Sequence, residues 1–552
     1  MILDVHVASK AFGADELYTE LDLRLEKSEK VGVIGRNGVG KSTLLDIIAG
    51  TDTDYDGETF IKKGCSLVSS RQEHHGHTEL PVLRYILGDL PEYSSLKHIL
   101  DTYPESMGDN ARMLHDYSDA MDRFMSLGYY EIENSIESMM SLYQLDTALL
   151  TRKIGSLSGG QLRLVELIKV QVADANIILI DEPTNHMDYV AKEDFIKWLS
   201  SSSAAIVVIT HDRDVLSSVD RIVEIRDGSA HSYPGNYEKY LAMNTDQMAG
   251  AIHEYEVVKA RIRNLEGDVV RFQRLKEKAR NPGTIKRFKG QEIKARAELA
   301  RLQEKDKPSF WIDQDSTKEL GTKLQAAYGE HKAKTIRLRL PGHETVHKKL
   351  LVADDISLGY DTQLFKPVTF ELFSGSKLVL KGRNGVGKST LVSAIIATLS
   401  GQPPTSTIYS GTIDVSQQVP FGVYSQSFDE HYLTYSLHEA VEHSYRSRGL
   451  DITDQKIRTL LSDFLFNPIG DGQKPMSVLS GGQKARFQLI AMLANTPQIL
   501  FLDEPTNHLD LPSIEELEYT LSRYHGAIVY VSHDTHFCTA LGGDVVELNS
   551  VE

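Results

Sequence analysis

The chain has 552 residues, a formal net charge of −17, 41% hydrophobic and 25% charged residues. This length predicts roughly three to four average domains, and the composition is ordinary for a soluble protein. The sequence has no apolar run of about 18 residues, which excludes a membrane-spanning helix. Only Cys65 and Cys538 are present. Two separate cysteines exclude a disulfide framework, so we expect a protein of the reducing cytoplasm.

The N-terminal segment leads into a phosphate-binding loop. Residues 1–30 alternate apolar and polar side chains, which predicts short antiparallel strands, and a buried strand follows at 31–34. A Gly-rich turn and a helix at 44–49 come next, in the strand, G-x-x-x-x-G-K-S, helix order that binds phosphates. The predicted nucleotide-binding residues are Gly35, Asn37, Gly38, Gly40, Lys41, Ser42 and Thr43. Lys41 is expected to reach the β- and γ-phosphates and Ser42 to ligate Mg²⁺.

The same loop recurs after a second strand at 378–380. Its predicted nucleotide-binding residues are Gly382, Asn384, Gly385, Gly387, Lys388, Ser389 and Thr390. Ser389 is the second predicted Mg²⁺ ligand of this kind. Because a chance Gly-rich turn is not expected twice in the same context, the repeat predicts two nucleotide-binding units on one chain.

Four further motifs repeat in the same order, each pair separated by 322 residues. The first is Leu-Ser-Gly-Gly-Gln, which supplies Ser158, Gly159, Gly160 and Gln161 in one copy and Ser480, Gly481, Gly482 and Gln483 in the other. The second is an apolar strand that ends in Asp181-Glu182 or Asp503-Glu504. The third is Pro-Thr-Asn-His-x-Asp, and the fourth is a buried strand that ends at His211 or His533.

The residue types indicate hydrolysis of a nucleoside triphosphate. Asp181 and Asp503, each at the end of an apolar strand, can hold Mg²⁺ or its water. The adjacent Glu182 and Glu504 can polarise the attacking water. The combined motifs resemble the ATP-binding cassette superfamily, and the resemblance covers nearly the whole chain outside residues 251–305.

The resemblance implies the fold and several further roles. It implies an α/β fold with two tandem P-loop nucleotide-binding domains that bind ATP and Mg²⁺. His211 and His533 are similar to the residues that contact the γ-phosphate and fix the water. Gln72 and Gln426 match the glutamine that senses Mg²⁺ and the γ-phosphate.

In cassettes of this kind each ATP lies between the P-loop of one copy and the signature of the other. We therefore expect Ser480, Gly482 and Gln483 to complete the site built on Lys41. Ser158, Gly160 and Gln161 are expected to complete the site built on Lys388. Phe12 and Tyr360 occupy the place of the aromatic residue that stacks on adenine, although a single aromatic near a strand is also typical of a core.

The two copies differ in their middle regions. Gln72 and Ser158 are 86 residues apart, whereas Gln426 and Ser480 are 54 apart, so the first copy has 32 additional residues. The pattern from Leu96 to Leu145 is helical, and we interpret it as a larger helical subdomain that packs on the first cassette.

Residues 251–305 belong to neither copy. Apolar or small residues recur at spacings of four and three from Ala251 to Phe272, which predicts a coiled-coil helix. The pattern breaks at Asn281-Pro282-Gly283 and resumes from Phe288, so we expect an antiparallel hairpin with arms of about 25 residues and roughly 37 Å. Fifteen Lys and Arg against eight Asp and Glu give this segment a charge of +7.

The predicted tip, residues 280–290, contains Arg280, Lys286, Arg287, Phe288 and Lys289 and no acidic residue. A basic, aromatic-bearing tip suits a phosphate backbone, so these are candidate RNA contacts. The alternative is a solvated linker whose basicity is incidental. The predicted domains are a first cassette at 1–240, the linker at 241–334 and a second cassette at 335–552.

Two cassettes joined by a basic hairpin resemble the ABC-F family, whose members act on the ribosome. The resemblance implies an ATPase whose linker enters the tRNA exit site and points toward the peptidyl tRNA and the peptidyl transferase centre of the large subunit. A long arm looks absent or shortened and a C-terminal coiled coil looks absent, which favours the subgroup that protects ribosomes from antibiotics.

The alternative within the family is a housekeeping factor that relieves stalled ribosomes. The tandem ATPase subunit of a membrane transporter is less favoured, because such a subunit rarely needs a basic arm of this length. A DNA-repair ATPase would usually show zinc-binding cysteine sets or a much longer coiled coil. We therefore expect neither a membrane subunit nor DNA as a partner.

Overall fold

The computed structural model divides the chain into two compact units. It describes residues 1–13, 15–70, 77–106, 108, 110–185, 187–303, 311–313, 316–317, 320, 322–332, 334–338, 348–415 and 419–551. One unit comprises residues 1–237 together with 336–552, and the other comprises residues 238–335. The sequence placed the corresponding boundaries after residues 240 and 334.

Two sheets build the first cassette. The antiparallel sheet contains β1 (Leu3–Phe12), β2 (Asp15–Tyr18), β3 (Leu21–Leu25) and β5 (Asp56–Ile61). The second sheet has the order β10-β9-β4-β8-β7-β6 and contains β4 (Lys30–Gly35), β6 (Leu67–Ser69), β7 (Ile177–Asp181), β8 (Ala205–Ile209), β9 (Arg221–Arg226) and β10 (Ser229–Pro234). In β3 burial alternates, whereas β7 and β8 are buried throughout, as strands covered on both faces are.

The second cassette repeats this arrangement. Its antiparallel sheet has the order β12-β11-β14 and contains β11 (Lys349–Gly359), β12 (Val368–Phe373) and β14 (Thr407–Val415). Its parallel sheet has the order β15-β16-β17-β13-β18 and contains β13 (Lys377–Lys381), β15 (Phe421–Tyr424), β16 (Ile499–Asp503), β17 (Ala527–Val531) and β18 (Asp544–Glu547). This order matches β6-β7-β8-β4-β9, which confirms the internal repeat and the α/β fold.

Each cassette also contains helices. Those of the first cassette are α1 (Lys41–Ala49), α2 (Val82–Gly88), α3 (Tyr93–Ser106), α4 (Ala111–Ser126), α5 (Ile132–Leu142), α6 (Gly159–Val172), α7 (Tyr189–Ser201) and α8 (Arg213–Leu216). Those of the second are α13 (Lys388–Leu399), α14 (Leu437–Arg446), α15 (Asp454–Asp463), α16 (Gly481–Met492), α17 (Leu511–Ser522) and α18 (Thr535–Leu541). Short 3₁₀ helices lie at Tyr129–Glu131, Thr147–Thr151, Ile154–Ser156, Glu430–Thr434 and Met476–Val478.

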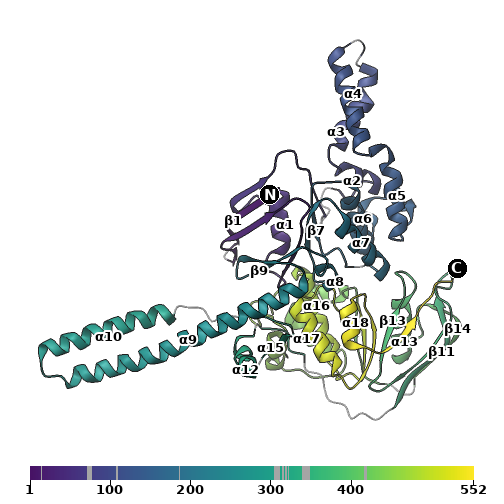
Figure 1. The fold of residues 1–552 in the computed structure, drawn as a ribbon. Helices are drawn as coiled ribbons and strands as arrows, with labels where there is room; N and C mark the ends of the chain where they lie inside the picture. Colours follow the sequence, from purple (N-terminus) through teal and green to yellow (C-terminus); the bar gives the residue numbers. More distant parts are fainter. Residues whose placement is uncertain are drawn as a thin grey trace. The chain divides into compact units, whose positions relative to one another are not determined.

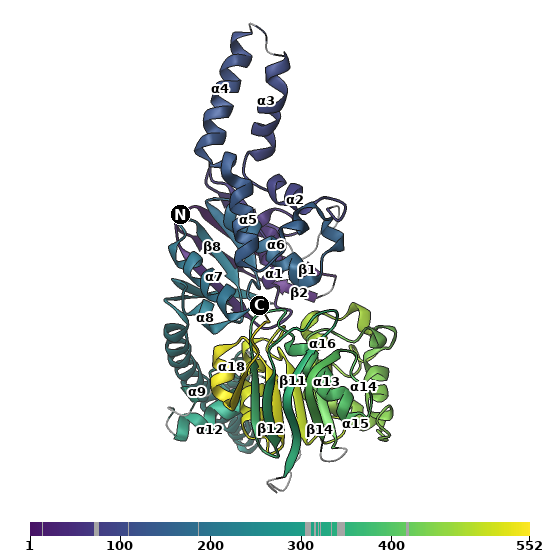
Figure 2. The same ribbon diagram turned by 90° about the vertical axis from the view of Figure 1, so that its right-hand side faces the viewer.

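The additional residues of the first copy form a two-helix arm. Helices α3 and α4 contact each other along their length and project from their cassette (Figures 1 and 2). Only Leu96 of α3 and Ala120 and Phe124 of α4 are buried among their described residues. The helical prediction is confirmed, but these two helices protrude instead of packing on the cassette. The structure thus has an arm where the sequence suggested an absent or shortened one.

Among its described residues, the other unit contains a helical hairpin and a short helix. Helices α9 (Tyr237–Lys278) and α10 (Pro282–Gln303) pair through Leu265, Ala295 and Leu302, which confirms the predicted hairpin and its break. Helix α9 has 42 residues, a length of about 63 Å, because it begins at Tyr237 and not near Ala251. Its earlier residues pack differently, since Met248 and Ile252 contact Ile312 and α12 (Thr322–His331).

None of the helices in the described part of the chain combines the length and the apolar surface needed to span a membrane.

Candidate ATP-hydrolysis sites

Glycine shapes both P-loops. Gly40 and Gly387 precede α1 and α13 with φ of 96° and 100°, a left-handed conformation that other residues rarely adopt. A Cβ on Gly40 would lie 2.6 Å from the hydroxyl of Tyr18 and 2.7 Å from Leu17, so only glycine fits there. Neither helix start has a side-chain cap, which leaves backbone N–H groups directed at the place where phosphates are expected.

The P-loop lysines fold back onto their own loops. Lys41 Nζ donates hydrogen bonds to the carbonyls of Gly35 at 2.8 Å and Arg36 at 3.1 Å. Lys388 Nζ donates to Gly382 at 2.8 Å and to the next residue at 3.0 Å. Burial lowers the pKa of both ammonium groups, and the nearby acidic side chains oppose this shift. Each cation is therefore held inside the loop, where a triphosphate would compensate its burial.

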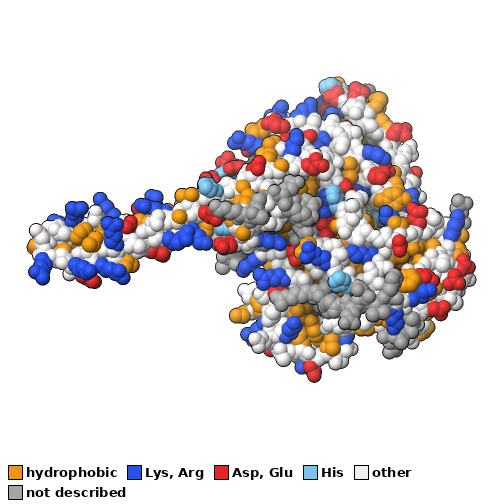
Figure 3. Space-filling model, turned by 60° about the horizontal axis from the view of Figure 1, so that its bottom comes forward, with side chains coloured by type: hydrophobic (Ala, Val, Ile, Leu, Met, Phe, Trp, Pro, Cys, Tyr) orange, Lys and Arg blue, Asp and Glu red, His pale blue; other side chains and the backbone are white. Residues whose placement is uncertain are grey.

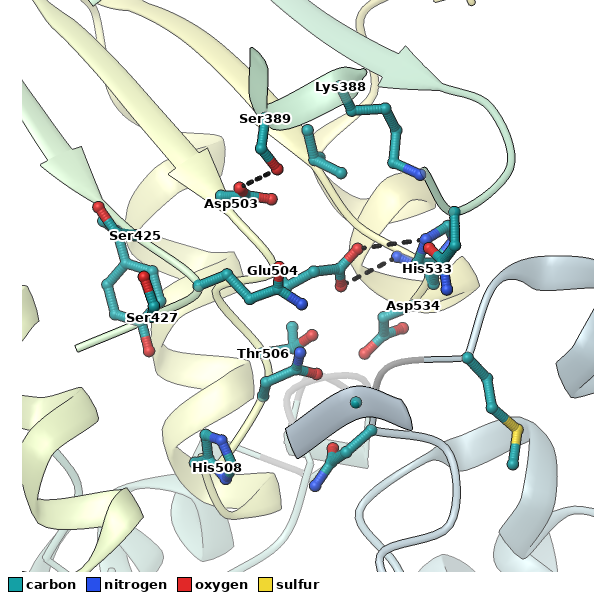
Figure 4. A pocket seen from close by; sticks show the side chains of 18 of the residues that line it. Lys388, Ser389, Ser425, Ser427, Asp503, Glu504, Thr506, His508, His533 and Asp534 are labelled. Atoms are coloured by element: carbon teal, nitrogen blue, oxygen red, sulfur yellow. Dashed lines mark hydrogen bonds and ion pairs between the residues drawn. The ribbon is translucent and has the colours of Figure 1, made fainter. Parts of the chain in front are cut away.

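The strand-ending aspartates lie where a divalent cation could bind. Asp181 and Asp503 are the last residues of β7 and β16. In the second cassette Ser389 Oγ donates to Asp503 Oδ2 at 2.7 Å, which joins the two side chains that were predicted to hold Mg²⁺ (Figure 4). A hydroxyl and a carboxylate are the hard oxygen ligands that this ion prefers, so the residues fit it.

Each glutamate next to these aspartates lies opposite a histidine. Glu182 Oε1 is 3.5 Å from His211 Nε2, and Glu504 Oε1 is 3.6 Å from His533 Nε2. The backbone N–H of His533 also donates to Glu504 at 3.3 Å (Figure 4). Both glutamates have positive φ, 46° and 50°, a strained conformation that is typical of functional positions.

Burial controls the protonation of these pairs. It raises the pKa of Glu182 and of Glu504 to about 8, and it lowers the pKa of His211 to about 3 and of His533 to about 4. The imidazoles are therefore neutral at pH 7, and a glutamate whose pKa lies about one unit above that pH is, in its ionised form, a stronger base than an ordinary carboxylate.

Several buried polar atoms of the sites have no hydrogen-bond partner among the described residues. They include both ring nitrogens of His211 and Glu504 Oε1. Buried polar atoms are normally paired, so these atoms indicate a polar ligand at the sites. A γ-phosphate and the water that attacks it would provide such partners.

The second site is assembled from both cassettes. A cavity of ≈ 840 Å³ is lined on one side by Ser158, Gly159 and Gly160 of the first signature. On the other side it is lined by P-loop residues 384–385 and 387–390 with Gln426, Asp503, Glu504 and His533. Gln161 does not line this cavity, because its side chain accepts from Ser158 N at 3.1 Å and caps α6. Gln483 caps α16 in the same way.

The first site has the reciprocal arrangement. Asn37 Nδ2 of the first P-loop donates to the carbonyl of His508 at 2.8 Å, and Asn37 N donates to Asp510 at 3.3 Å. The same asparagine side chain lies against the second signature, because a Cβ on Gly482 would be 2.4 Å from Asn37 Nδ2. The first P-loop therefore touches the second signature, and the completion of the Lys41 site by Ser480, Gly482 and Gln483 stays a prediction.

Two aspartates that the sequence analysis left without a role bridge the cassettes. Asp510 contacts Asn37, and Asp188 contacts Arg383 Nε at 3.3 Å and the backbone N–H of Asn384 at 3.4 Å. Both also cap the helix that follows, α17 or α7. Both aspartates end the repeated motif Pro-Thr-Asn-His-x-Asp, which could have marked them as functional. The motif does not indicate which residues the aspartates contact.

The two aromatic residues proposed for adenine are surface residues. Phe12 and Tyr360 are each 57% exposed near the ends of β1 and β11, so the alternative that they belong to the core does not hold. Stacking on adenine stays a prediction for both. Gln72 lies outside the described residues.

These features define a tandem P-loop ATPase with two composite sites. A family model described as "ABC transporter" matches residues 18–185 and 365–507, and a second model of that description matches residues 223–310. The ATP-binding protein YdiF of Bacillus subtilis is 31% identical, over 100% of this chain and 80% of its own. The ATP-binding protein Uup of Escherichia coli is 25% identical, over 97% of this chain and 78% of its own. The chain belongs to the ATP-binding cassette family, as a member of its ABC-F group, and it is an ATPase.

Solved structures show the same fold. An archaeal ribosome recycling factor in complex with a ribosomal stalk protein aligns over 98% of this chain and 87% of its own, with a TM-score of 0.54 and 16% identity. A protein named RNase-L Inhibitor aligns over 99% of this chain and 88% of its own, with a TM-score of 0.52 and 16% identity.

Replacing both glutamates tests their proposed role as proton acceptors. The double variant Glu182→Gln, Glu504→Gln keeps the shape of each side chain but removes its basicity, so ATP turnover should fall by about 10² to 10⁴. Binding of ATP should persist, because the P-loops and signatures are unchanged. Steady-state phosphate release and equilibrium nucleotide binding measure the two effects, and undiminished turnover would reject the assignment.

The raised pKa of Glu504 predicts a pH effect on stability without nucleotide. The folded state keeps this proton until about pH 8, whereas the unfolded chain loses it near 4.5. Between these values unfolding releases a proton, so the free energy of unfolding falls as pH rises, by up to about 1 kcal/mol per pH unit. Glu504→Gln should therefore gain stability over the parent from pH 5.5 to pH 8 in urea titrations. The exposed Glu58→Gln is the control, and parallel curves for all three proteins would contradict the prediction.

Proposed function

We propose that this ATPase acts on the ribosome, with the hairpin of α9 and α10 as its RNA-binding element. In this proposal ATP joins the cassettes at both composite sites, and the joined form is the one that binds. Hydrolysis then releases it. The observation that carries the proposal is the unpaired positive charge at the tip of the hairpin.

Several cations in the stem of the hairpin pair with its acidic residues. Lys276 Nζ lies 2.6 Å from Glu292, and Arg261 lies 2.9 Å from Glu298. At the tip the situation differs, because Arg280, Lys286, Arg287 and Lys289 are exposed and have no acidic partner among the described residues. Figure 3 shows Lys and Arg side chains gathered along this hairpin. Exposed cations without an acidic partner at the tip of a helical hairpin favour a phosphate backbone as the partner.

The fold comparison supports the same proposal. A paired-cassette protein of similar fold is named a ribosome recycling factor. In the present chain the hairpin lies between the cassettes in the sequence, so closure of the cassettes on ATP would act on both of its roots. We propose that this closure directs the tip toward the peptidyl tRNA and the peptidyl transferase centre of the large subunit.

The proposed chemistry uses the side chains of both cassettes. Mg²⁺, held by Ser42 and Asp181 or by Ser389 and Asp503, would neutralise charge on the phosphates when bound. The adjacent glutamate accepts a proton from the attacking water, and the neutral histidine orients that water and the γ-phosphate. The signature of the opposite cassette closes the site and excludes solvent.

Two biological outcomes of ribosome binding are proposed. One is protection from an antibiotic, in which the tip displaces a drug bound to the large subunit. The other is relief of a stalled ribosome. The α3–α4 arm favours the second, because its exposed Leu114, Met121 and Met125 add a surface beside the first cassette that a drug-displacing tip does not require.

Co-sedimentation with ribosomes tests the proposed function. The double Gln variant should sediment with 70S ribosomes in ATP and stay in the supernatant in ADP, because only ATP joins the cassettes. Membrane vesicles that carry no ribosomes serve as the comparison and should retain little protein. Equal sedimentation in ATP and ADP would contradict the coupling, and binding to vesicles alone would favour the transporter interpretation.

The tip charges should determine the salt dependence of that binding. Replacing Arg280, Lys286, Arg287 and Lys289 by Ala removes four cations, so the log–log salt slope should decrease by up to about 3, taking about 0.7 per charge. Basal ATPase activity should change little, since the ATP sites lie in the other unit.

A charge-matched control separates the tip from general basicity. Its four replaced residues are the exposed stem residues Arg263, Arg274, Lys294 and Arg301. It should keep most of the parental slope if the tip makes the contacts. An equal decrease in both quadruple variants would show that the charge of the whole hairpin matters, and an unchanged slope in the tip variant would indicate that the tip does not touch RNA.

A further inference from the structure

The two ATP sites share their motifs but differ in the contacts of the segment that carries the histidine. Lys192 lies on α7 of the first cassette and lines, with His533 and Glu504, a cavity that also reaches Glu182 and His211 of the first site. Its Nζ donates to the backbone carbonyl of His533 at 3.0 Å. A lysine of one cassette thus holds the segment that carries the histidine of the opposite site.

The three hydrogens of the Lys192 ammonium all have acceptors. Besides the carbonyl of His533, Nζ lies 2.6 Å from Asp214 and 3.2 Å from Asp212, both at the start of α8. Three donors matched to three acceptors fix the position of this group, which is 4% exposed. Burial opposes its charge, but the two carboxylates raise its pKa, so it stays an ammonium ion.

The same cluster continues into the second cassette. Thr535 Oγ1 donates to Asp214 at 2.8 Å, and His536 Nε2 lies 3.6 Å from the same carboxylate. Asp214 therefore contacts Lys192 on its own side and two residues that directly follow the His533 segment on the other. The cluster ties the backbone of His533 and the side chains of Thr535 and His536, on either side of Asp534, to the first cassette.

The first site lacks this arrangement. At the spacing of 322 residues that relates the two copies, Ile514 corresponds to Lys192 and His536 to Asp214. Ile514 is 2% exposed and packs in the apolar core of its cassette. An isoleucine cannot donate to the carbonyl of His211, so the two histidine segments are held by different means.

We propose that Lys192 is a positioning residue for the second ATP site, and that it aligns His533 with Glu504 only while the cassettes are docked. Turnover at the site built on Lys388 then depends on Lys192 more strongly than turnover at the site built on Lys41, where Lys192 contacts Asp212 beside His211 and not the carbonyl of the histidine itself. The two sites share the same motifs but differ in the residues that hold the histidine segment in place. This inference rests on the roles given above to Glu504 and His533, and it does not depend on ribosome binding.

Single-site proteins test the proposal without ribosomes. Glu182→Gln leaves only the second site able to hydrolyse ATP, and Glu504→Gln leaves only the first. Adding Lys192→Met should lower kcat roughly 10- to 100-fold in the first of these backgrounds, the scale on which misplaced groups act, with KM for ATP nearly unchanged. In the second background the loss of kcat should be several-fold smaller, because Lys192 contacts there the side chain of Asp212, the residue after His211, and not the carbonyl of the histidine. Lys192→Arg, which keeps charge and donors, should restore a large part of the loss.

Lys197→Met is the matched control, because Lys197 lies on the same helix, is 71% exposed and pairs only with Asp194 among the described residues. It should leave both backgrounds unchanged. An equal loss of kcat in both backgrounds, or no loss in either, would overturn the proposal. If Lys192→Met does not fold, Asp214→Asn removes one anchor of the ammonium and should give the same selective loss. The turnover of the single variants Glu182→Gln and Glu504→Gln without a change at Lys192 tests the role of each glutamate. A wrong role for the glutamates can therefore be told apart from a wrong role for Lys192.

Discussion

The structure depends on the exchange of P-loops and signatures between the two cassettes. Asn37 meets His508 and Asp510 across the interface, and Arg383 meets Asp188 in the reciprocal place. The buried guanidinium of Arg213, which bonds Glu518 of the second cassette at 3.0 Å, adds a charged contact that only the docked arrangement satisfies. Since a buried charge left without its partner is strongly unfavourable, such a pair favours one docking geometry over others.

The same constraint explains what the sequence could and could not predict. The P-loops were predictable because their backbone requires glycine at positions such as Gly40, and the strands because runs such as Ile177 to Ile180 are wholly apolar. The roles of Asp188, Asp510 and Lys192 were not, since each contacts residues about 200 to 470 positions away that only the docked cassettes bring together. The length of helix α9 was underestimated for a related reason, because Met248 and Ile252 pack in a separate cluster with Ile312 and not in the hairpin seam.

The linker is positively charged although the whole chain is negatively charged, which gives the linker a role distinct from that of the cassettes. The whole chain has a net charge of −17, which would repel nucleic acid if it were spread evenly. In the hairpin, acidic residues such as Glu292 pair with stem cations, and the tip cations stay exposed. In the proposed account ATP is hydrolysed in one unit and RNA is contacted by the other. Closure of the cassette interface on ATP then determines whether the protein binds the ribosome.

The most direct test of this account is whether each signature acts on the opposite site. Ser158→Arg places a bulky cation in the first signature and can be combined with each single Gln variant. Trans completion predicts that turnover is abolished with Glu182→Gln, where only the Lys388 site is active, and stays within about twofold of its parent with Glu504→Gln. The reverse pattern, with loss only in the Glu504→Gln protein, would show that each signature serves its own cassette and would contradict the account.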